Sequence, residues 1–325
     1  MDKALFCVDS PLQALCAIEA IDKFKPKEYD FLLVENGVRT IQIENLLKSE
    51  NIRYEIVKSR YSIWEQFGFI YDSFLPRRSN YDSIFFGHYL AIGILFSLIP
   101  LLKNQGQIIY VDDGNYIIPL SRNTTTIPLL TKIRRFILSI VCSIRKIHDD
   151  NFFTIYAENI DNKNWNIIKN ELNRIMSTCT IHDDGIVYVI GTVPDVYCNY
   201  LGISLNVFIQ KLGSFLSTIK NDNPGTKIIY IPHGRDNNEN IKQLCRQLDI
   251  SYQKNDCCIE LYAYNRPRPQ FIYGFSSTAL FTLQKMMPGT KVVNIQLDGK
   301  NRAAMKEYDE INSFFKKNGI STINL

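Results

Sequence analysis

The clearest candidates for chemistry in this chain are two adjacent carboxylates, Asp112 and Asp113, which follow the apolar run 107–111 and precede Gly114. Asp-Gly is a strong turn signal, so an ordinary turn explains the stretch when it is taken alone. A carboxylate at the end of a buried strand can also serve as a general base when the strand delivers it to a ligand site. The stretch therefore predicts a turn that carries a candidate base, with Gly114 beside the substrate.

A histidine follows a second apolar run. His233 comes after residues 227–231, preceded by Pro232 and followed by Gly234 and Arg235. Proline restricts the approach of the chain, and glycine lets a ligand come close to the backbone. A lone histidine is commonly structural, but this position also makes His233 a candidate acid or phosphate ligand, with Gly234 and Arg235 as substrate-binding neighbours.

Hydroxyl groups open a predicted helix later in the chain. Ser276, Ser277 and Thr278 follow the run 270–274 and precede the helical pattern ALFTLQKM. Hydroxyls and unpaired backbone N–H groups at a helix N-terminus bind anions such as phosphate. The alternative is an ordinary N-cap, which the same residue types form.

Polar residues also follow two other apolar runs. Ser10 comes after the first run and is expected to cap a helix and to lie near the substrate. Gly191 and Thr192 follow residues 186–190, and Asp195 comes shortly after them. Asp195 is an alternative base, in which case the adjacent carboxylates are turn residues only.

These groups must be positioned by an α/β fold. Short apolar runs alternate with helical patterns, which is typical of parallel sheets covered on both faces. The runs are 4–8, 30–34, 83–86 and 107–111 in the first half and 186–190, 227–231, 270–274 and 291–295 in the second. We expect two such sheets, with ligands outside the carboxyl ends of their strands. No G-x-G-x-x-G follows any predicted strand, which disfavours a dehydrogenase.

The length of 325 residues and the apolar content of 46% suit two domains. We place them at 1–180 and 181–325. Between them lies a segment, 145–185, that is polar at both ends and has helical spacing through Trp165, Ile168, Leu172 and Ile175. The last amphipathic helix, 301–320, could pack on either domain.

Composition excludes several classes of protein. A net charge of +4 with 22% charged residues is too small an imbalance for a nucleic-acid binder. The eight cysteines form no C-x-x-C pair and the four histidines are scattered, which argues against a zinc site and a disulfide framework. The N-terminus has no signal-peptide pattern, and the longest apolar run, 89–102, is a buried helix too short to span a bilayer, so we expect a cytoplasmic protein.

One segment suggests a membrane surface. Residues 128–148 combine five Lys and Arg residues with a broad apolar face. Such a helix can lie peripherally on anionic lipid, or it can be a domain helix with a solvated basic edge.

The candidate groups together suit a displacement on a phosphate-activated sugar that needs no metal. A carboxylate would take the proton from an acceptor hydroxyl, while a histidine and a hydroxyl-rich helix start would receive the departing phosphate.

The motifs DDG at 112–114, HG at 233–234 and SS at 276–277 resemble those of bacterial sialyltransferases, in that order along the chain. The opening CVDSPLQALCAIEAI also resembles the start of glycosyltransferase family 52, the lipooligosaccharide sialyltransferases. One difference is that this chain has Gly234 where the histidine motif of the family usually has proline.

The resemblance implies a GT-B fold, with two Rossmann-like domains whose parallel sheets face each other across a cleft. It implies transfer of sialic acid from CMP-sialic acid, with inversion and no divalent metal or other cofactor, to a galactose or N-acetylgalactosamine hydroxyl of a lipooligosaccharide, O-antigen or capsule. Asp112 would be the base with Asp113 orienting it, and His233 would be the acid. Ser276 and Ser277 would hold the phosphate, and Gly191 and Thr192 would line the nucleotide pocket.

Alternatives from the same residues are a glycosyltransferase that uses CMP-Kdo or a UDP-sugar, or a nucleotide- or glycan-binding module without catalysis. A homodimer is also compatible with the sequence.

Overall fold

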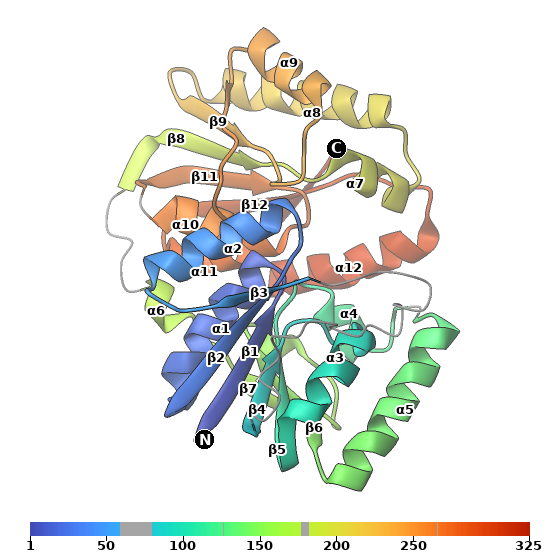
Figure 1. The fold of residues 1–325 in the computed structure, drawn as a ribbon. Coiled ribbons are helices and arrows are strands. Elements are labelled where there is room, and N and C mark those ends of the chain that lie inside the picture. Colours follow the sequence, from blue (N-terminus) through green and yellow to red (C-terminus); the bar gives the residue numbers. More distant parts are fainter. Residues whose placement is uncertain (59–79, 126, 177–181, 265) are drawn as a thin grey trace. The chain divides into compact units, whose positions relative to one another are not determined.

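The computed structural model describes residues 1–58, 80–125, 127–176, 182–264 and 266–325 (Figure 1). They form two compact units, Met1–Leu172 and Asn173–Leu325. Each unit contains one sheet whose strand pairs are all parallel. The predicted α/β fold with two Rossmann-like domains is confirmed. The units divide between Leu172 and Asn173, whereas the sequence suggested 180 and 181.

The first unit has a seven-stranded sheet in the order β3-β2-β1-β4-β5-β6-β7. Its strands are β1 (Lys3–Val8), β2 (Glu28–Val34), β3 (Glu55–Val57), β4 (Tyr81–Phe86), β5 (Leu102–Val111), β6 (His148–Thr154) and β7 (Asn166–Lys169). Its helices are α1 (Pro11–Phe24), α2 (Val38–Ser49), α3 (Ile92–Leu98), η2 (Ile99–Leu101), α4 (Ile117–Ser121), α5 (Leu129–Arg145) and η3 (Ala157–Asn159).

Helices cover both faces of this sheet, as the alternation of side chains along the strands requires. On one face Phe24 of α1 contacts Phe85 of β4 and Phe153 of β6, with ring centroids 5.2 and 5.5 Å apart. On the other face a buried cluster joins residues of β1, β4, β5 and β6 to α3 and α5, among them Ile84 and Leu138. The strands are therefore apolar on both sides, which explains their continuous apolar runs.

The second unit has a six-stranded sheet in the order β10-β9-β8-β11-β12-β13. Its strands are β8 (His182–Ile190), β9 (Lys227–Ile231), β10 (Ser251–Tyr252), β11 (Arg268–Gly274), β12 (Lys291–Gln296) and β13 (Ser321–Asn324). Its helices are α6 (Asn173–Met176), α7 (Pro194–Leu201), α8 (Leu205–Asp222), α9 (Glu239–Gln247), α10 (Ile259–Tyr264), α11 (Thr278–Met286) and α12 (Arg302–Lys317). The predicted last helix is confirmed as α12, which contacts α7 and β13 of its own unit.

Two predictions of local structure need correction. Helical spacing was expected through Trp165, Ile168, Leu172 and Ile175, but Ile168 lies in β7, which with β6 stands at one end of the first sheet, and only the short α6 is helical. Residues 177–181 of this segment lie outside the described residues. The exposed first half of β6 is polar, and β7 is a short edge strand, so neither shows a full apolar run. The run 89–102 is helical only in part, because Pro100 falls in the 3₁₀ turn η2 and Leu102 already starts β5.

The strand order reverses once in each sheet. In the first unit the chain moves outward from β1 to β3 and then returns to β4 on the other side of β1. In the second unit the same happens between β8 and β11. Such a switch point, at the carboxyl ends of the strands, is where open α/β sheets bind ligands. Among the residues that the structure describes, no helix is both long and apolar enough to cross a membrane.

Candidate functional site

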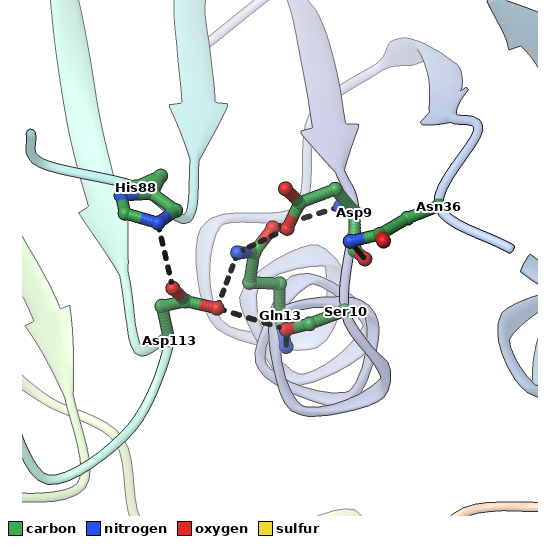
Figure 2. A network of polar contacts seen from close by, with 6 residues as sticks. All are labelled: Asp9, Ser10, Gln13, Asn36, His88 and Asp113. Carbon is green, nitrogen blue, oxygen red and sulfur yellow. Dashed lines mark hydrogen bonds and ion pairs between the residues drawn. The ribbon is translucent and has the colours of Figure 1, made fainter. Parts of the chain in front are cut away.

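Asp113 lies at the centre of a polar network at the switch point of the first unit (Figure 2). Its Oδ1 accepts hydrogen bonds from Ser10 Oγ at 3.1 Å and from Gln13 Nε2 at 2.6 Å. Its Oδ2 lies 3.3 Å from His88 Nε2. Ser10 and Gln13 begin the helix after β1, His88 follows β4 and Asp113 follows β5. The network therefore gathers side chains from three neighbouring strand ends.

Gln13 fixes the distance between two carboxylates. Its Nε2 donates to Asp9 Oδ1 at 2.7 Å as well as to Asp113, and its Oε1 accepts the Asp9 N–H at 2.9 Å. Burial raises the pKa of Asp9, and the nearby charge of Asp113 raises it further. Gly87 makes room for this amide, because a Cβ at that position would lie 1.9 Å from Gln13 Cδ. Asn36 Nδ2 donates to the Asp9 carbonyl at 3.2 Å.

Asp112 points the other way and is a buried structural carboxylate. Its side chain accepts hydrogen bonds from Thr154 Oγ1 at 2.6 Å and from the Ile155 N–H at 2.8 Å, and Cys16 Sγ lies 3.8 Å away. Burial raises its pKa to about 7, although the hydrogen bonds from Thr154 and Ile155 oppose that shift. Asp112 is 1% exposed.

The two adjacent carboxylates differ in solvent exposure, because the Asp113 side chain is 28% exposed whereas Asp112 is buried. The sequence pointed to Asp112 as base with Asp113 orienting it. The geometry suits the reverse arrangement, because a base has to reach its substrate. Gly114 has a φ of 138°, a left-handed value that favours glycine in the turn after the two carboxylates.

A small pocket opens beside Asp113 and His88. It has a volume of about 60 Å³, and its aromatic wall includes Tyr89, Tyr110 and Phe152. The rings of Tyr89 and Tyr110 meet edge to face with centroids 4.9 Å apart. The accessible face of the carboxylate thus borders an apolar surface, which is a suitable wall for one face of a sugar.

In the second unit, His233 and Gly191 lie at adjacent strand ends. Gly191 follows β8, and its N–H donates to the Ile231 carbonyl of β9 at 2.8 Å. A Cβ on Gly191 would lie 2.5 Å from Tyr230 Oη, so a larger residue does not fit without movement. His233 Nδ1 accepts the Arg235 N–H at 3.2 Å, which places the proton of a neutral imidazole on Nε2.

The serine motif also lies at the switch point of this unit. Ser276 has a left-handed φ of 44°, and its N–H donates to Asn294 Oδ1 at 2.7 Å. Ser277 caps α11, because its Oγ accepts the Ala279 N–H at 3.2 Å. The cap uses a lone pair of Ser277 and leaves its hydroxyl proton to donate to an anion. Thr278 is the first residue of α11.

The other predicted residues lie nearby in sequence but differ in exposure. Thr192 is half-buried after β8, and Arg235 is exposed beyond His233. Asp195 is exposed in the first turn of α7. Gly234 lies in the turn closed by the hydrogen bond from the Asp236 N–H to the His233 carbonyl, at 2.7 Å.

Sequence reasoning missed four residues that position these groups, namely Asp9, Gln13, His88 and Asn294. The spacing of Asp9 and Gln13 across a helix start was a usable signal, since side chains four residues apart can meet there. No local pattern marks Asn294, which lies inside a buried strand. Within the described ranges, no group of three or more His, Cys, Asp or Glu side chains is arranged to hold a metal ion.

No protein-family model and no curated protein matches this chain. Solved structures do resemble it. An α/β-galactoside α-2,3-sialyltransferase from the luminous marine bacterium Photobacterium phosphoreum is 12% identical, over 99% of this chain and 98% of the other, with a TM-score of 0.54. The GT-B domain of a sialyltransferase from Photobacterium damselae is 11% identical over 99% of both chains, with a TM-score of 0.51.

A third similar structure is the Anabaena protein HepE in complex with UDP and glucose. It is 12% identical, over 94% of this chain and 83% of the other, with a TM-score of 0.52. At such identities the likeness shows the fold alone, and it confirms the predicted GT-B fold. The relation to glycosyltransferase family 52 stays a prediction.

The buried carboxylate predicts how stability depends on pH. The pKa of Asp112 rises from 3.8 to about 7 on burial, so the folded protein holds this proton more tightly than the unfolded chain does. The stabilisation is complete below pH 3.8 and is lost as the pH rises toward about 7. In Asp112→Asn we expect the free energy of unfolding to decline less over this range, by at most about 4 kcal/mol.

Urea unfolding of both proteins at several pH values measures this difference. Asp161→Asn is the control, because Asp161 is an exposed carboxylate of the same unit and its loss leaves the Asp112 titration in place. Equal pH dependence of wild type and Asp112→Asn would contradict the assignment of a buried, titrating Asp112.

Proposed function

We propose that this protein is an inverting glycosyltransferase that moves sialic acid from CMP-sialic acid to a galactose or N-acetylgalactosamine hydroxyl of a bacterial surface glycan, such as lipooligosaccharide, O-antigen or capsule. The proposal rests on Asp113, an accessible carboxylate held by donors from other strand ends at a switch point. The motif order along the chain and the fold shared with two Photobacterium sialyltransferases support it.

Asp113 is the proposed base, in place of Asp112. A carboxylate has about four acceptor positions, and the contacts to Ser10, Gln13 and His88 occupy three of them. The remaining position can take the proton of an acceptor hydroxyl. The same contacts hold the carboxylate in one orientation, so little reorganisation is needed at the moment of reaction.

The proposed donor groups are in the second unit. His233 donates its Nε2 proton to a phosphate oxygen of CMP, and Ser276, Ser277 and the N–H groups at the start of α11 bind the same phosphate. Gly191 and Thr192 line the nucleotide pocket, and Gly191 allows the nucleotide to approach the backbone. Arg235 adds positive charge near the phosphate, and no divalent metal is required.

The proposed transfer is a single displacement in which one bond forms as another breaks. The acceptor oxygen forms a bond to the anomeric carbon of sialic acid as Asp113 takes its proton. The bond from that carbon to the phosphate oxygen breaks, its electron pair stays on CMP, and His233 hydrogen-bonds the charge that develops there. One displacement at the anomeric carbon inverts its configuration.

The pocket beside Asp113 limits what the acceptor can insert. Its volume is only about 60 Å³, so we expect it to take the hydroxyl-bearing edge of a sugar. Tyr89, a partly exposed residue in its wall, offers an apolar surface to the C–H face of that sugar. We expect the rest of the glycan to remain outside this pocket.

The first experiment measures release of CMP from CMP-sialic acid by the purified protein, with and without a galactose-terminated acceptor and with EDTA present. We expect acceptor-stimulated release that survives EDTA and falls by about 10²- to 10⁴-fold in Asp113→Asn. Asp195→Asn, which changes an exposed carboxylate of the second unit, is expected to lose less than about tenfold. Asp112→Asn disturbs the turn that positions Asp113 but leaves that carboxylate in place, so it is expected to lose less activity than Asp113→Asn. A large loss in Asp195→Asn with an active Asp113→Asn would reassign the base.

Variants of Gln13 and Gly87 offer a second test of Asp113 as the base, because each is expected to disturb the contact between the Gln13 amide and Asp113. Gly87→Ala pushes the Gln13 amide away from Asp113, and Gln13→Ala removes it. We expect each variant to lower kcat by about tenfold or more, and the double variant to be little worse than either single one, since both changes break the same contact. Additive losses in the double variant would show that the two residues act separately.

The identity of the donor is tested by ligand-induced stabilisation. HepE, whose structure holds UDP and glucose, makes a UDP-sugar the alternative donor. We expect CMP at about 100 times its Kd to stabilise the protein by about 2.7 kcal/mol, and UDP at the same concentration to have little effect. Stabilisation by UDP alone would make the protein a UDP-sugar transferase, and CMP binding without turnover on any acceptor would favour a binding module.

Ser277→Ala tests the phosphate site in the same assay. The variant loses the cap of α11, which costs about 1 kcal/mol, and it should also weaken CMP binding. Ser204→Ala is the matched control, because Ser204 caps α8 in the same unit through a bond from the Val207 N–H at 3.3 Å. We expect equal losses of stability but normal CMP binding in the control. Equal CMP affinity in both variants would argue against Ser277 as a ligand.

A further inference from the structure

The outer face of α5 is an apolar surface that points to solvent in the described structure. Seven of its large apolar side chains are exposed, and Leu129, Phe136 and Ile144 are 73%, 67% and 77% exposed. The whole set, which we call the α5 apolar stripe, is Leu129, Leu130, Ile133, Phe136, Ile137, Ile140 and Ile144. At 100° per residue these positions fall within an arc of about 120° on one side of the helix.

The opposite side of α5 is the part that holds it to its own unit. Leu138 and Cys142 are buried in the core cluster, and Arg145 donates to the backbone carbonyls of Ile99 and Leu102. A domain helix normally turns its apolar stripe inward and leaves a polar face outside. The inward face of α5 already packs against the core of its own unit through Leu138 and Cys142. The α5 apolar stripe is therefore a second and separate apolar surface.

Basic side chains border the stripe. Lys132 lies on one side of the arc and is exposed, and Ser139 and Ser143 extend the polar edge beside it. Arg134 lies on the other side, where it is half-buried and has a contact within the protein. The helix has no acidic residue along its length. A wide exposed apolar arc with basic edges is the pattern of helices that lie in the interface of an anionic bilayer.

The charges distinguish a bilayer from a second copy of this chain. Two copies that met through α5 would bring their basic edges together with no carboxylate on either helix to neutralise them, and like charges in an interface are unfavourable. Anionic headgroups supply the missing negative charge, and the acyl region accepts the apolar side chains.

We propose that α5 docks this protein on the surface of an anionic phospholipid bilayer, with the α5 apolar stripe inserted at the headgroup boundary and Lys132 among the headgroups. The helix lies on the membrane and does not span it. This surface contains none of the residues proposed to carry out the transfer, so its test is separate from that of the proposed activity.

The test is co-sedimentation of the full chain with vesicles. We expect binding to vesicles of equal parts phosphatidylcholine and phosphatidylglycerol, weak binding to pure phosphatidylcholine, and loss of binding in high salt. Phe136→Glu and Ile144→Glu should each weaken binding by about tenfold or more, since each removes a large apolar side chain from the inserted face. Lys132→Glu should weaken binding only at low salt.

Ile41→Glu is the matched control, because Ile41 is an exposed isoleucine on α2 of the same unit. It should bind vesicles like the wild type. Thermal unfolding of all variants checks that they fold.

Three results would overturn the proposal. The first is failure of the wild type to bind anionic vesicles, or equal binding by Phe136→Glu. The second is a wild-type dimer that Ile144→Glu converts to a monomer without any vesicle binding, which would make the stripe an interface between copies. The third is a much larger loss of thermal stability in Ile144→Glu than in Ile41→Glu, which would show that the stripe is covered within the folded chain.

Discussion

The hydrogen bonds that Asp112 accepts from Thr154 and Ile155 fix the candidate site of the first unit. They tie the end of β5 to the end of β6, at the point where the parallel pairing of these strands stops. The turn that follows must then leave in one direction, and Asp113 is the next residue. Burial of Asp112 therefore directs the Asp113 side chain toward Ser10, Gln13 and His88.

This arrangement has an energetic cost, because it collects carboxylates at one edge of a sheet. Burial raises the pKa of Asp112 to about 7, and burial together with the charge of Asp113 raises the pKa of Asp9. A site that forces such groups together is less stable than the fold could be without it, and such costs are common where a protein binds or reacts. Gln13 offsets part of the cost, since its amide donates to Asp9 and to Asp113.

The sequence was sufficient to predict the fold because the sheets are parallel and buried on both faces. Each central strand is then an uninterrupted apolar run, and β9 was predicted to the residue, at Lys227–Ile231. The polar start of β6 and the short edge strand β7 carry no such run. The candidate residues Asp113, His233 and Ser277 also follow predicted strands.

The details of the site could not be predicted, because they depend on contacts between distant parts of the chain. Gln13 and Asp113 are 100 residues apart, and nothing near Gln13 indicates that its amide joins two carboxylates. Which of two adjacent aspartates is buried depends on where Thr154 lies, and Thr154 is 42 residues from Asp112. Residue type and strand position give the list of candidates, whereas tertiary packing assigns their roles.

The pocket and the proposed membrane surface share one helix. Arg135 of α5 stacks over the Tyr89 ring at 3.8 Å from its centroid, and it donates to Tyr110 Oη at 2.8 Å. Both tyrosines line the pocket beside Asp113, so the inner face of α5 supports the wall of that pocket. If the outer face of α5 rests on a bilayer, the pocket is held at a fixed height above the lipid. An acceptor glycan carried by a lipid would then meet Asp113 only when its reactive hydroxyl lies at that height, whereas a free oligosaccharide has no such restriction. The position of a single helix would in this way select among acceptors that present the same terminal sugar.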